Sequence, residues 1–295
     1  MPSAQHEAIV QMLAAQPHNP AATVAETRAG FEQLAQFFPL AADVRAEAVD
    51  AGGVPAEWVS VPQSRAERVI LYLHGGGYVI GSPNSHRELA SRIARATRTR
   101  VLVPDYRLAP EHPFPAAPED AVACYRWLLD SGVAPAHIVI AGDSAGGGLT
   151  LATLTAVRDE KLPLPAAGVC LSPWVDLELT GASAQPDGAD DPLRDFADLH
   201  GMGKLYAAAN PRHPRAAPLY ADYHGLPPLL ILVGTREVLL DDARRVAAKA
   251  KAAGVSVTLE EWEGLIHVWP LFGPEMPEGQ QAVARIGEFA CQHMN

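Results

Sequence analysis

The chain has 295 residues, of which 48% are hydrophobic and 19% are charged, as in ordinary globular proteins. This length allows one large α/β domain with a substantial core. The 34 acidic and 23 basic residues give a formal charge of −11, which disfavours binding to nucleic acid or to an anionic membrane surface.

The N-terminal part of the chain predicts two short amphipathic helices. Between residues 3 and 38, apolar residues recur at helical spacing, and Pro17 and Pro20 divide the pattern into two pieces. Two strands are expected near 45–50 and 56–61, joined by a Gly-Gly turn as an antiparallel pair.

From Arg68 onward, the sequence has the pattern of a parallel sheet covered by helices. Short aliphatic runs alternate with helical stretches, and nearly continuous runs of this kind are typical of strands buried on both faces. The expected strands are 69–73, 101–103, 138–141, 168–171, 229–233 and 255–259. The expected helices are 86–97, 118–130, 145–158, 240–253 and 279–292. With the N-terminal hairpin, this predicts a single α/β domain over residues 1–295 with a mostly parallel sheet of about eight strands.

One connection is longer than a crossover needs. About fifty residues separate the sixth and seventh expected strands, which indicates an insertion. Within it, Asp190-Asp191-Pro192-Leu193 predicts a helix start. An amphipathic stripe follows, formed by Phe196, Leu199, Leu205 and Tyr206. We expect residues 183–222, together with the N-terminal residues 1–42, to form a helical cap over the end of the sheet where a ligand binds.

The number of cysteines and the lack of long apolar segments indicate the cellular compartment of the protein. Cys124, Cys170 and Cys291 lack the CxxC spacing of a zinc site or a redox pair, and few cysteines fit a reducing compartment. The first residues show no basic segment followed by an apolar one, and no stretch approaches about eighteen uninterrupted apolar residues. We therefore expect a cytoplasmic protein that does not enter a membrane.

The run Gly142-Asp143-Ser144-Ala145-Gly146 is a GxSxG motif between an expected strand and an expected helix. This is the context of a nucleophile elbow. Glycines flank the serine because the strained turn leaves no room for Cβ atoms, and the helix amino terminus favours developing negative charge. We expect Ser144 to be the nucleophile. The alternative is a glycine-rich turn whose serine only caps the helix.

Three consecutive glycines, Gly75, Gly76 and Gly77, follow the expected strand 69–73. Their backbone N–H groups can point at one place, as in an oxyanion hole. We expect the amides of Gly76 and Gly77 to act with that of Ala145, and Gly75 is a further candidate in the same loop. The alternative is a phosphate-binding loop, which would require glycine where Ile80 stands.

A serine nucleophile needs a base, and the base needs an orienting carboxylate. In α/β-hydrolases these follow the nucleophile in the order acid, then histidine. His267, after the last expected strand, is the expected base. Glu237 stands closest to the end of strand 229–233 and is the expected acid. Asp241 and Asp242 fit the first turn of the next helix, although Asp241 remains an alternative acid.

Together these motifs resemble the hormone-sensitive-lipase-like esterases, or bacterial family IV, of the α/β-hydrolase superfamily. The resemblance covers about residues 68–270, with signatures at 74–77 and 142–147 and a third block at 105–116. It implies hydrolysis of short- to medium-chain carboxylic esters, a helical cap, no cofactor and no metal. Members of the family often form homodimers through the edge of the last strand, and the sequence leaves the oligomeric state of this chain open. The acid is usually aspartate in this family, so Glu237 implies an active site with a slightly displaced carboxylate.

The resemblance implies a structural role for the third block, with Arg107 and Glu111 paired beneath the site, whereas Asp143 receives no role. The candidate walls of the substrate pocket are apolar or amphipathic: Phe37, Phe38, Tyr78, Trp174, Leu205 and Tyr206. Two other functions fit the same fold. A ligand-binding homologue would lack the base that His267 supplies here, whereas amide or lactone hydrolysis would use every proposed catalytic residue.

Overall fold

The computed structural model describes residues 2–15, 19, 21–34, 37–185, 188–192 and 196–294, without the side chains of Leu34 and Phe196. Eight strands form one sheet in the order β1-β2-β4-β3-β5-β6-β7-β8. Their bounds are β1 (Arg45–Asp50), β2 (Pro55–Ser60), β3 (Arg65–Leu73), β4 (Thr99–Pro104), β5 (Ile138–Asp143), β6 (Ala167–Leu171), β7 (Leu229–Gly234) and β8 (Val257–Trp262). The first two pairings, β1 with β2 and β2 with β4, are antiparallel, and all others are parallel. The predicted α/β-hydrolase architecture is confirmed.

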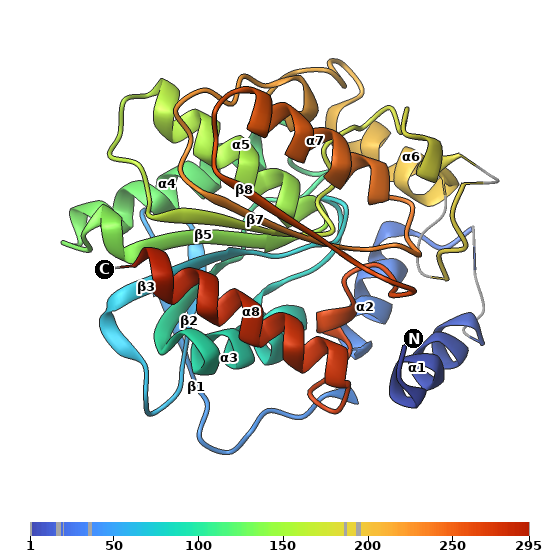
Figure 1. Ribbon diagram of the computed structural model, residues 1–295, viewed down its shortest axis with the longest axis horizontal. Coiled ribbons are helices and arrows are strands. Elements are labelled where there is room, and N and C mark those ends of the chain that lie inside the picture. The colour runs from blue at the N-terminus through green and yellow to red at the C-terminus, as the bar shows by residue number, and fades with distance from the viewer. Residues whose placement is uncertain are drawn as a thin grey trace.

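The α-helices observed in the described ranges are α1 (Ala4–Ala14), α2 (Val24–Leu34), α3 (Pro83–Thr97), α4 (Ala116–Asp130), α5 (Ala145–Asp159), α6 (Phe196–Ala207), α7 (Leu240–Ala252) and α8 (Pro277–His293). Helices α3 and α8 cover one face of the sheet, and α4, α5 and α7 cover the other (Figure 1). Alternate residues of β3 serve the two cores, with Ile70 and Tyr72 on one face and Leu71 and Leu73 on the other. This double burial explains the continuous aliphatic runs in the sequence.

Helices α1, α2 and α6 gather at one end of the sheet (Figure 1). Helix α6 contacts the loop after β3, because the ring of Tyr206 stacks on that of Tyr78 with centroids 3.8 Å apart. Helix α2 reaches the same loop through Arg28, whose Nε donates to the Val79 carbonyl over 2.8 Å. Helix α1 is tied to the start of α8, where the Ser3 hydroxyl donates to Glu278 over 2.8 Å.

The predicted helix start at 190–193 lies partly outside the described residues. Helix α6 begins at Phe196, and residues 193–195 lie outside the described ranges, as do Pro17 and Pro20. Asp190 pairs with Arg236 over 2.7 Å, and Asp191 accepts from the Val238 N–H over 3.1 Å. These two acids therefore fasten the insertion to the loop after β7.

None of the helices in the described part of the chain combines the length and the apolar character that a membrane crossing requires.

Candidate active site

Ser144 lies at the sharp junction between β5 and α5. Its φ of 53° and ψ of −120° are rare for a residue with a side chain. The Ser144 N–H donates to the Leu171 carbonyl over 2.8 Å, and its own carbonyl accepts from the Trp174 N–H over 2.9 Å. A Cβ at Gly146 would lie 1.9 Å from the Leu73 oxygen, so only glycine fits there. The surrounding strands thus hold the strained serine in place.

Three side chains form a hydrogen-bonded chain at this junction. Ser144 Oγ lies 2.9 Å from His267 Nε2, and His267 Nδ1 lies 2.7 Å from Glu237 Oε2. The exposed fractions of Ser144, His267 and Glu237 are 5%, 3% and 0%. An ionised carboxylate only accepts, so Nδ1 carries the proton and Nε2 is left to accept from the serine hydroxyl. This arrangement can deprotonate Ser144.

Glu237, and not Asp241, contacts the histidine. Burial raises the pKa of Glu237, while the hydrogen bonds from His267 and the Gly234 N–H lower it. The Ser172 hydroxyl donates to the other carboxylate oxygen, Oε1, over 2.8 Å. Asp241 instead lies in the first turn of α7, where its carboxylate accepts from the Ser183 N–H over 3.0 Å. The longer glutamate therefore reaches the histidine from the loop after β7.

The backbone N–H groups of the glycine loop after β3 differ in whether they have a hydrogen-bond acceptor. The Gly75 N–H donates to Asp143 Oδ1 over 3.0 Å, so it is occupied, and the expectation that Gly75 supplies an oxyanion amide is corrected. Gly76 and Gly77 have φ values of 119° and 62°, which favour glycine. Within the described part of the chain, the N–H groups of Gly76, Gly77 and Ala145 have no hydrogen-bond acceptor. These three amides remain available to a ligand.

Asp143, which accepts from the Gly75 N–H, received no role in the sequence analysis. Its carboxylate is buried, and Oδ1 also accepts from the Tyr72 hydroxyl over 2.8 Å, while Oδ2 lies 3.4 Å from His86 Nε2. Burial raises the pKa of Asp143, but the charge and hydrogen bonds of His86 and Tyr72 outweigh burial and hold the pKa below its usual value. Its position before Ser144 was the only sequence signal, and that position names no partner.

The expected pairing of Arg107 with Glu111 is wrong. Arg107 binds Asp120, with Nη2 2.7 Å from Oδ1, and Glu111 binds Arg28 of α2 over 2.7 Å. Residues 105 to 109 have no helical structure, so a spacing of four residues does not bring these side chains onto one face. The hydrogen bonds from Arg28 lower the pKa of Glu111 to about 2. The third block thus serves to hold α2.

Comparison with known proteins agrees with this geometry. Residues 70–271 match a family described as having the alpha/beta hydrolase fold. An acetyl-hydrolase of Streptomyces hygroscopicus is 45% identical over 98% of this chain and 97% of its own length. An esterase of the bacterial hormone-sensitive lipase family has a structure with a TM-score of 0.97, at 49% identity and full coverage of both chains. The structure of EstE5 soaked with p-nitrophenyl butyrate has a TM-score of 0.95, at 47% identity and 99% coverage of both chains.

This chain belongs to the α/β-hydrolase family, among its hormone-sensitive-lipase-like esterases. The residues expected to line the pocket of this esterase lie in different surroundings. Tyr78, Trp174 and Tyr206 are fully buried, and the Tyr78 ring contacts each of the other two rings. Phe37 and Leu205 are 65% and 40% exposed, so their side chains face solvent instead of packing inside.

Two further side chains pack against glycines. Phe38 packs against Gly273, in the segment before α8. Met202, which the sequence analysis did not select, lies directly over Gly77, where a Cβ would come within 2.1 Å of its sulfur. Its helical spacing from Leu199 and Tyr206 in α6 was the available signal.

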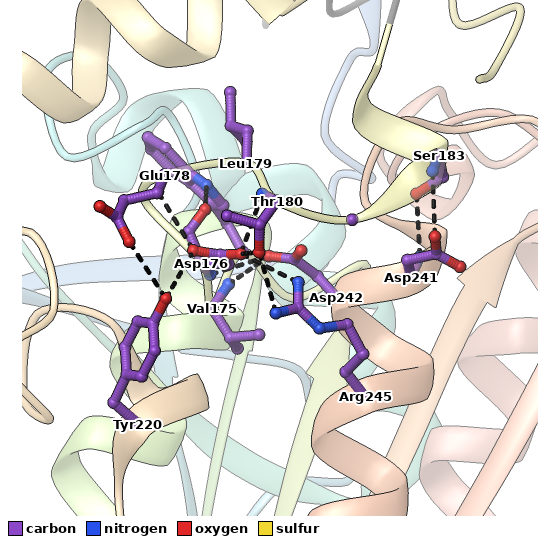
Figure 2. A network of polar contacts seen from close by, with 12 residues as sticks. Val175, Asp176, Glu178, Leu179, Thr180, Ser183, Tyr220, Asp241, Asp242 and Arg245 are labelled. Atoms are coloured by element: carbon purple, nitrogen blue, oxygen red, sulfur yellow. Dashed lines mark hydrogen bonds and ion pairs between the residues drawn. The ribbon is translucent and has the colours of Figure 1, made fainter. Parts of the chain in front are cut away.

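The loop after β6 carries Trp174 and is fastened to α7 (Figure 2). Asp242 Oδ2 accepts from the N–H groups of Val175 and Asp176 over 2.8 and 2.9 Å. Asp176 in turn binds Arg245, with Nη1 2.9 Å from Oδ2. Buried side chains from α7 therefore position the loop that carries Trp174.

Proposed function

We propose that this esterase hydrolyses short- to medium-chain carboxylic esters through an acyl-enzyme on Ser144. The supporting observation is the unbroken chain of hydrogen bonds from Ser144 through His267 to Glu237. A neutral histidine that accepts from the serine hydroxyl and donates to a buried carboxylate is the arrangement that activates a serine.

In this mechanism, His267 Nε2 takes the hydroxyl proton as Ser144 Oγ attacks the ester carbonyl carbon. The tetrahedral intermediate collapses, the C–O bond to the alcohol breaks, and His267 returns the proton to the departing alkoxide. Water then attacks the acyl-enzyme, giving its proton to His267, and the second collapse releases the acid and restores Ser144. The Glu237 carboxylate stabilises the imidazolium that forms in each half.

The N–H groups of Gly76, Gly77 and Ala145 are proposed to bind the oxyanion. They are without acceptors in the described part of the chain, and Ala145 begins α5, whose amino terminus favours negative charge. The glycine loop and the nucleophile elbow lie side by side because β3 and β5 are paired neighbours.

The preference for short acyl groups is supported by what surrounds the glycine loop. Met202 lies on Gly77, and the stacked rings of Tyr78 and Tyr206 lie next to it, so bulky side chains already fill this space. A long acyl chain would have to displace them. The similar Streptomyces protein is named an acetyl-hydrolase, and p-nitrophenyl butyrate is the compound soaked into EstE5.

The proposal is tested with Ser144→Ala on p-nitrophenyl esters of about two to sixteen acyl carbons. The variant should lose several orders of magnitude in kcat, and a serine-reactive phosphonate should label only the unaltered protein. The unaltered protein should work best on short chains. Near-normal turnover by Ser144→Ala would refute the assignment of the nucleophile, and a maximum at long chains would refute the proposed selectivity. Amide and lactone substrates in the same panel show whether esters are preferred.

The acid is tested by comparing Glu237→Gln with Asp241→Asn. Glutamine cannot stabilise the imidazolium, so a large loss of kcat is expected. The Asp241 carboxylate instead has Ser183 and Arg244 as its polar partners among the described residues. Loss of activity in Asp241→Asn alone would show that the acid is misassigned.

Homodimerisation and a cytoplasmic location are also proposed. Strand β8 is the last strand of the sheet and has one edge without a strand partner among the described residues, which supports pairing with a second copy. The three cysteines are free, as expected in a reducing compartment. Light scattering that shows only monomer at all concentrations would contradict the dimer.

A further inference from the structure

We propose that Ser172 is a positioning residue for this reaction, whose hydroxyl fixes the Glu237 carboxylate and joins it to the backbone beside His267. The inference rests on the proposed function, because it assigns a partner to the proposed acid. It concerns a residue that neither the GxSxG motif nor the glycine loop contains.

The position of Ser172 is set by the sheet. It directly follows β6, and its N–H continues the pairing with β7 by donating to the Leu232 carbonyl over 2.7 Å. Its φ is 45°, in a region that L-residues rarely adopt and glycine adopts freely, and its side chain is fully buried. A buried serine with a strained backbone at such a position indicates that its side chain has a functional role.

The directions of its two hydrogen bonds are forced. The Val268 N–H lies 3.2 Å from Ser172 Oγ and can only donate, so the hydroxyl oxygen accepts there. The single hydroxyl proton is then given to Glu237 Oε1, 2.8 Å away. One hydroxyl therefore contacts both the acid and the residue that follows the base.

These contacts determine how the carboxylate faces His267. Oε1 receives two donors, from Ser172 and from the Gly234 N–H, which leaves Oε2 for His267 Nδ1. Two donors on Oε1 oppose rotation of the carboxylate and favour its ionised form, against the burial that raises the pKa of Glu237. Val268 itself has a φ of 47°, so the Ser172 hydroxyl also steadies a strained residue next to the base.

The test compares Ser172→Ala and Ser172→Gly with the unaltered enzyme on p-nitrophenyl butyrate. Both variants should lose about 10- to 100-fold in kcat with little change in KM, the usual effect of removing a hydrogen bond to a charged group. Glycine relieves the positive φ, so a loss in Ser172→Gly cannot come from backbone strain. Thermal unfolding of each variant shows that it is folded.

The pH profile distinguishes positioning from a purely structural role. Without the Ser172 hydroxyl, the ionised Glu237 carboxylate loses one hydrogen-bond donor, so the pKa of Glu237 should rise further above its usual value and Glu237 should take up a proton more easily. The acid limb of kcat/KM should therefore move to higher pH. A control is Ser183→Ala, which removes a buried hydroxyl that binds the Val238 carbonyl and the Asp241 N–H, and it should leave this limb in place.

Unchanged kcat in both Ser172 variants, or a loss of kcat with an unmoved acid limb, would overturn the inference. Either result would leave the proposed function intact as long as Ser144→Ala remains inactive. An active Ser144→Ala would instead refute the function itself.

Discussion

Asp143 Oδ1 accepts a hydrogen bond from the backbone nitrogen of Gly75 over 3.0 Å, so the residue before the nucleophile holds the glycine loop. The Asp143 carboxylate packs so closely against Gly75 that a Cβ there would lie 2.1 Å from Oδ2. In the chain, Asp143 is followed by Ser144 and Ala145, and Gly75 is followed by Gly76. One buried carboxylate thus connects the two backbone segments whose free amides form the proposed oxyanion site.

Replacing Asp143 with alanine should therefore impair catalysis more than replacing it with asparagine. Asparagine Oδ1 can still accept from Gly75 and Tyr72, whereas alanine leaves both donors buried without an acceptor. We expect a loss in kcat of about 10- to 100-fold for Asp143→Ala and a smaller loss for Asp143→Asn. Steady-state kinetics on a short aryl ester measure both, and equal losses would show that charge, and not loop positioning, is what the carboxylate supplies.

The contact between Gly77 and Met202 predicts a rescue. A Cβ at Gly77 would lie 2.1 Å from the Met202 sulfur, so Gly77→Ala should sharply reduce kcat/KM. The steric obstacle is a flexible side chain, so adding Met202→Ala should restore part of the activity, while the positive φ of 62° at Gly77 keeps the rest lost. At Gly76, a Cβ would lie 2.2 Å from the Ile80 carbonyl oxygen, which is backbone and cannot be removed. The double variant Gly76→Ala with Met202→Ala is the control and should stay inactive. Rescue of both variants would contradict the assigned contacts.

The sheet could be predicted from the sequence because each strand leaves a pattern in its own run of residues. Strands such as β3 are buried on both faces and so appear as unbroken aliphatic runs, and the elbow needs glycines at fixed positions beside Ser144. The choice of Glu237 over Asp241 followed from which acid stands nearer to the end of β7. In the structure, only the nearer acid reaches His267.

The supporting contacts could not be predicted in this way. Ser172 and Glu237 are 65 positions apart, and Gly75 and Asp143 are 68 apart, so no local periodicity connects either pair. The predicted pair Arg107 and Glu111 failed for the opposite reason. Nearness in sequence suggested a contact, but the loop directs the two side chains to different elements.

Arg28 connects the N-terminal helix α2 to the loop after β3. Its guanidinium donates to the carbonyls of Val79 and Ala109 over 2.8 and 2.9 Å and to both carboxylate oxygens of Glu111. Arg28→Met keeps an unbranched apolar stem but removes all these hydrogen bonds. We expect faster proteolysis of the segment before β1, together with a severalfold lower kcat/KM, because a link to the loop that bears Gly76 and Gly77 is lost.

The control is Arg95→Met, which removes a pair with Asp43 whose two side chains are both well exposed. Exposed pairs contribute little, so this variant should keep normal kinetics and normal resistance to protease. Equal behaviour of the two arginine variants would show that Arg28 does not couple α2 to the site.

The carboxyl groups of Asp176 and Asp242 are both buried beneath the Trp174 loop, yet they titrate differently (Figure 2). Burial raises the pKa of Asp242 to about 7, and the negative charge of Asp176 adds to this effect. Burial also raises the pKa of Asp176, but hydrogen bonds from Thr180 and Arg245 outweigh it and hold that pKa below its usual value. Of these two carboxyl groups, Asp242 is therefore the one that changes charge near neutral pH.

Asp242 should make the protein less stable as the pH rises towards neutrality. The unfolded pKa is about 4, so between about pH 4 and 7 the folded state keeps a proton that the unfolded state has released. This contribution to the free energy of unfolding is complete below about pH 4 and is lost as the pH rises through about 7. Its upper limit is about 4 kcal/mol, because the folded and unfolded pKa values of Asp242 differ by about three units. Asp242→Asn stays neutral and can still accept from Val175 and Asp176. Its melting temperature should therefore fall less than that of the unaltered protein between pH 5 and 8, a range set around the pKa of about 7. Asp241→Asn, in the same helical turn, should behave like the unaltered protein, and a parallel decline in all three proteins would rule out Asp242 as the titrating group.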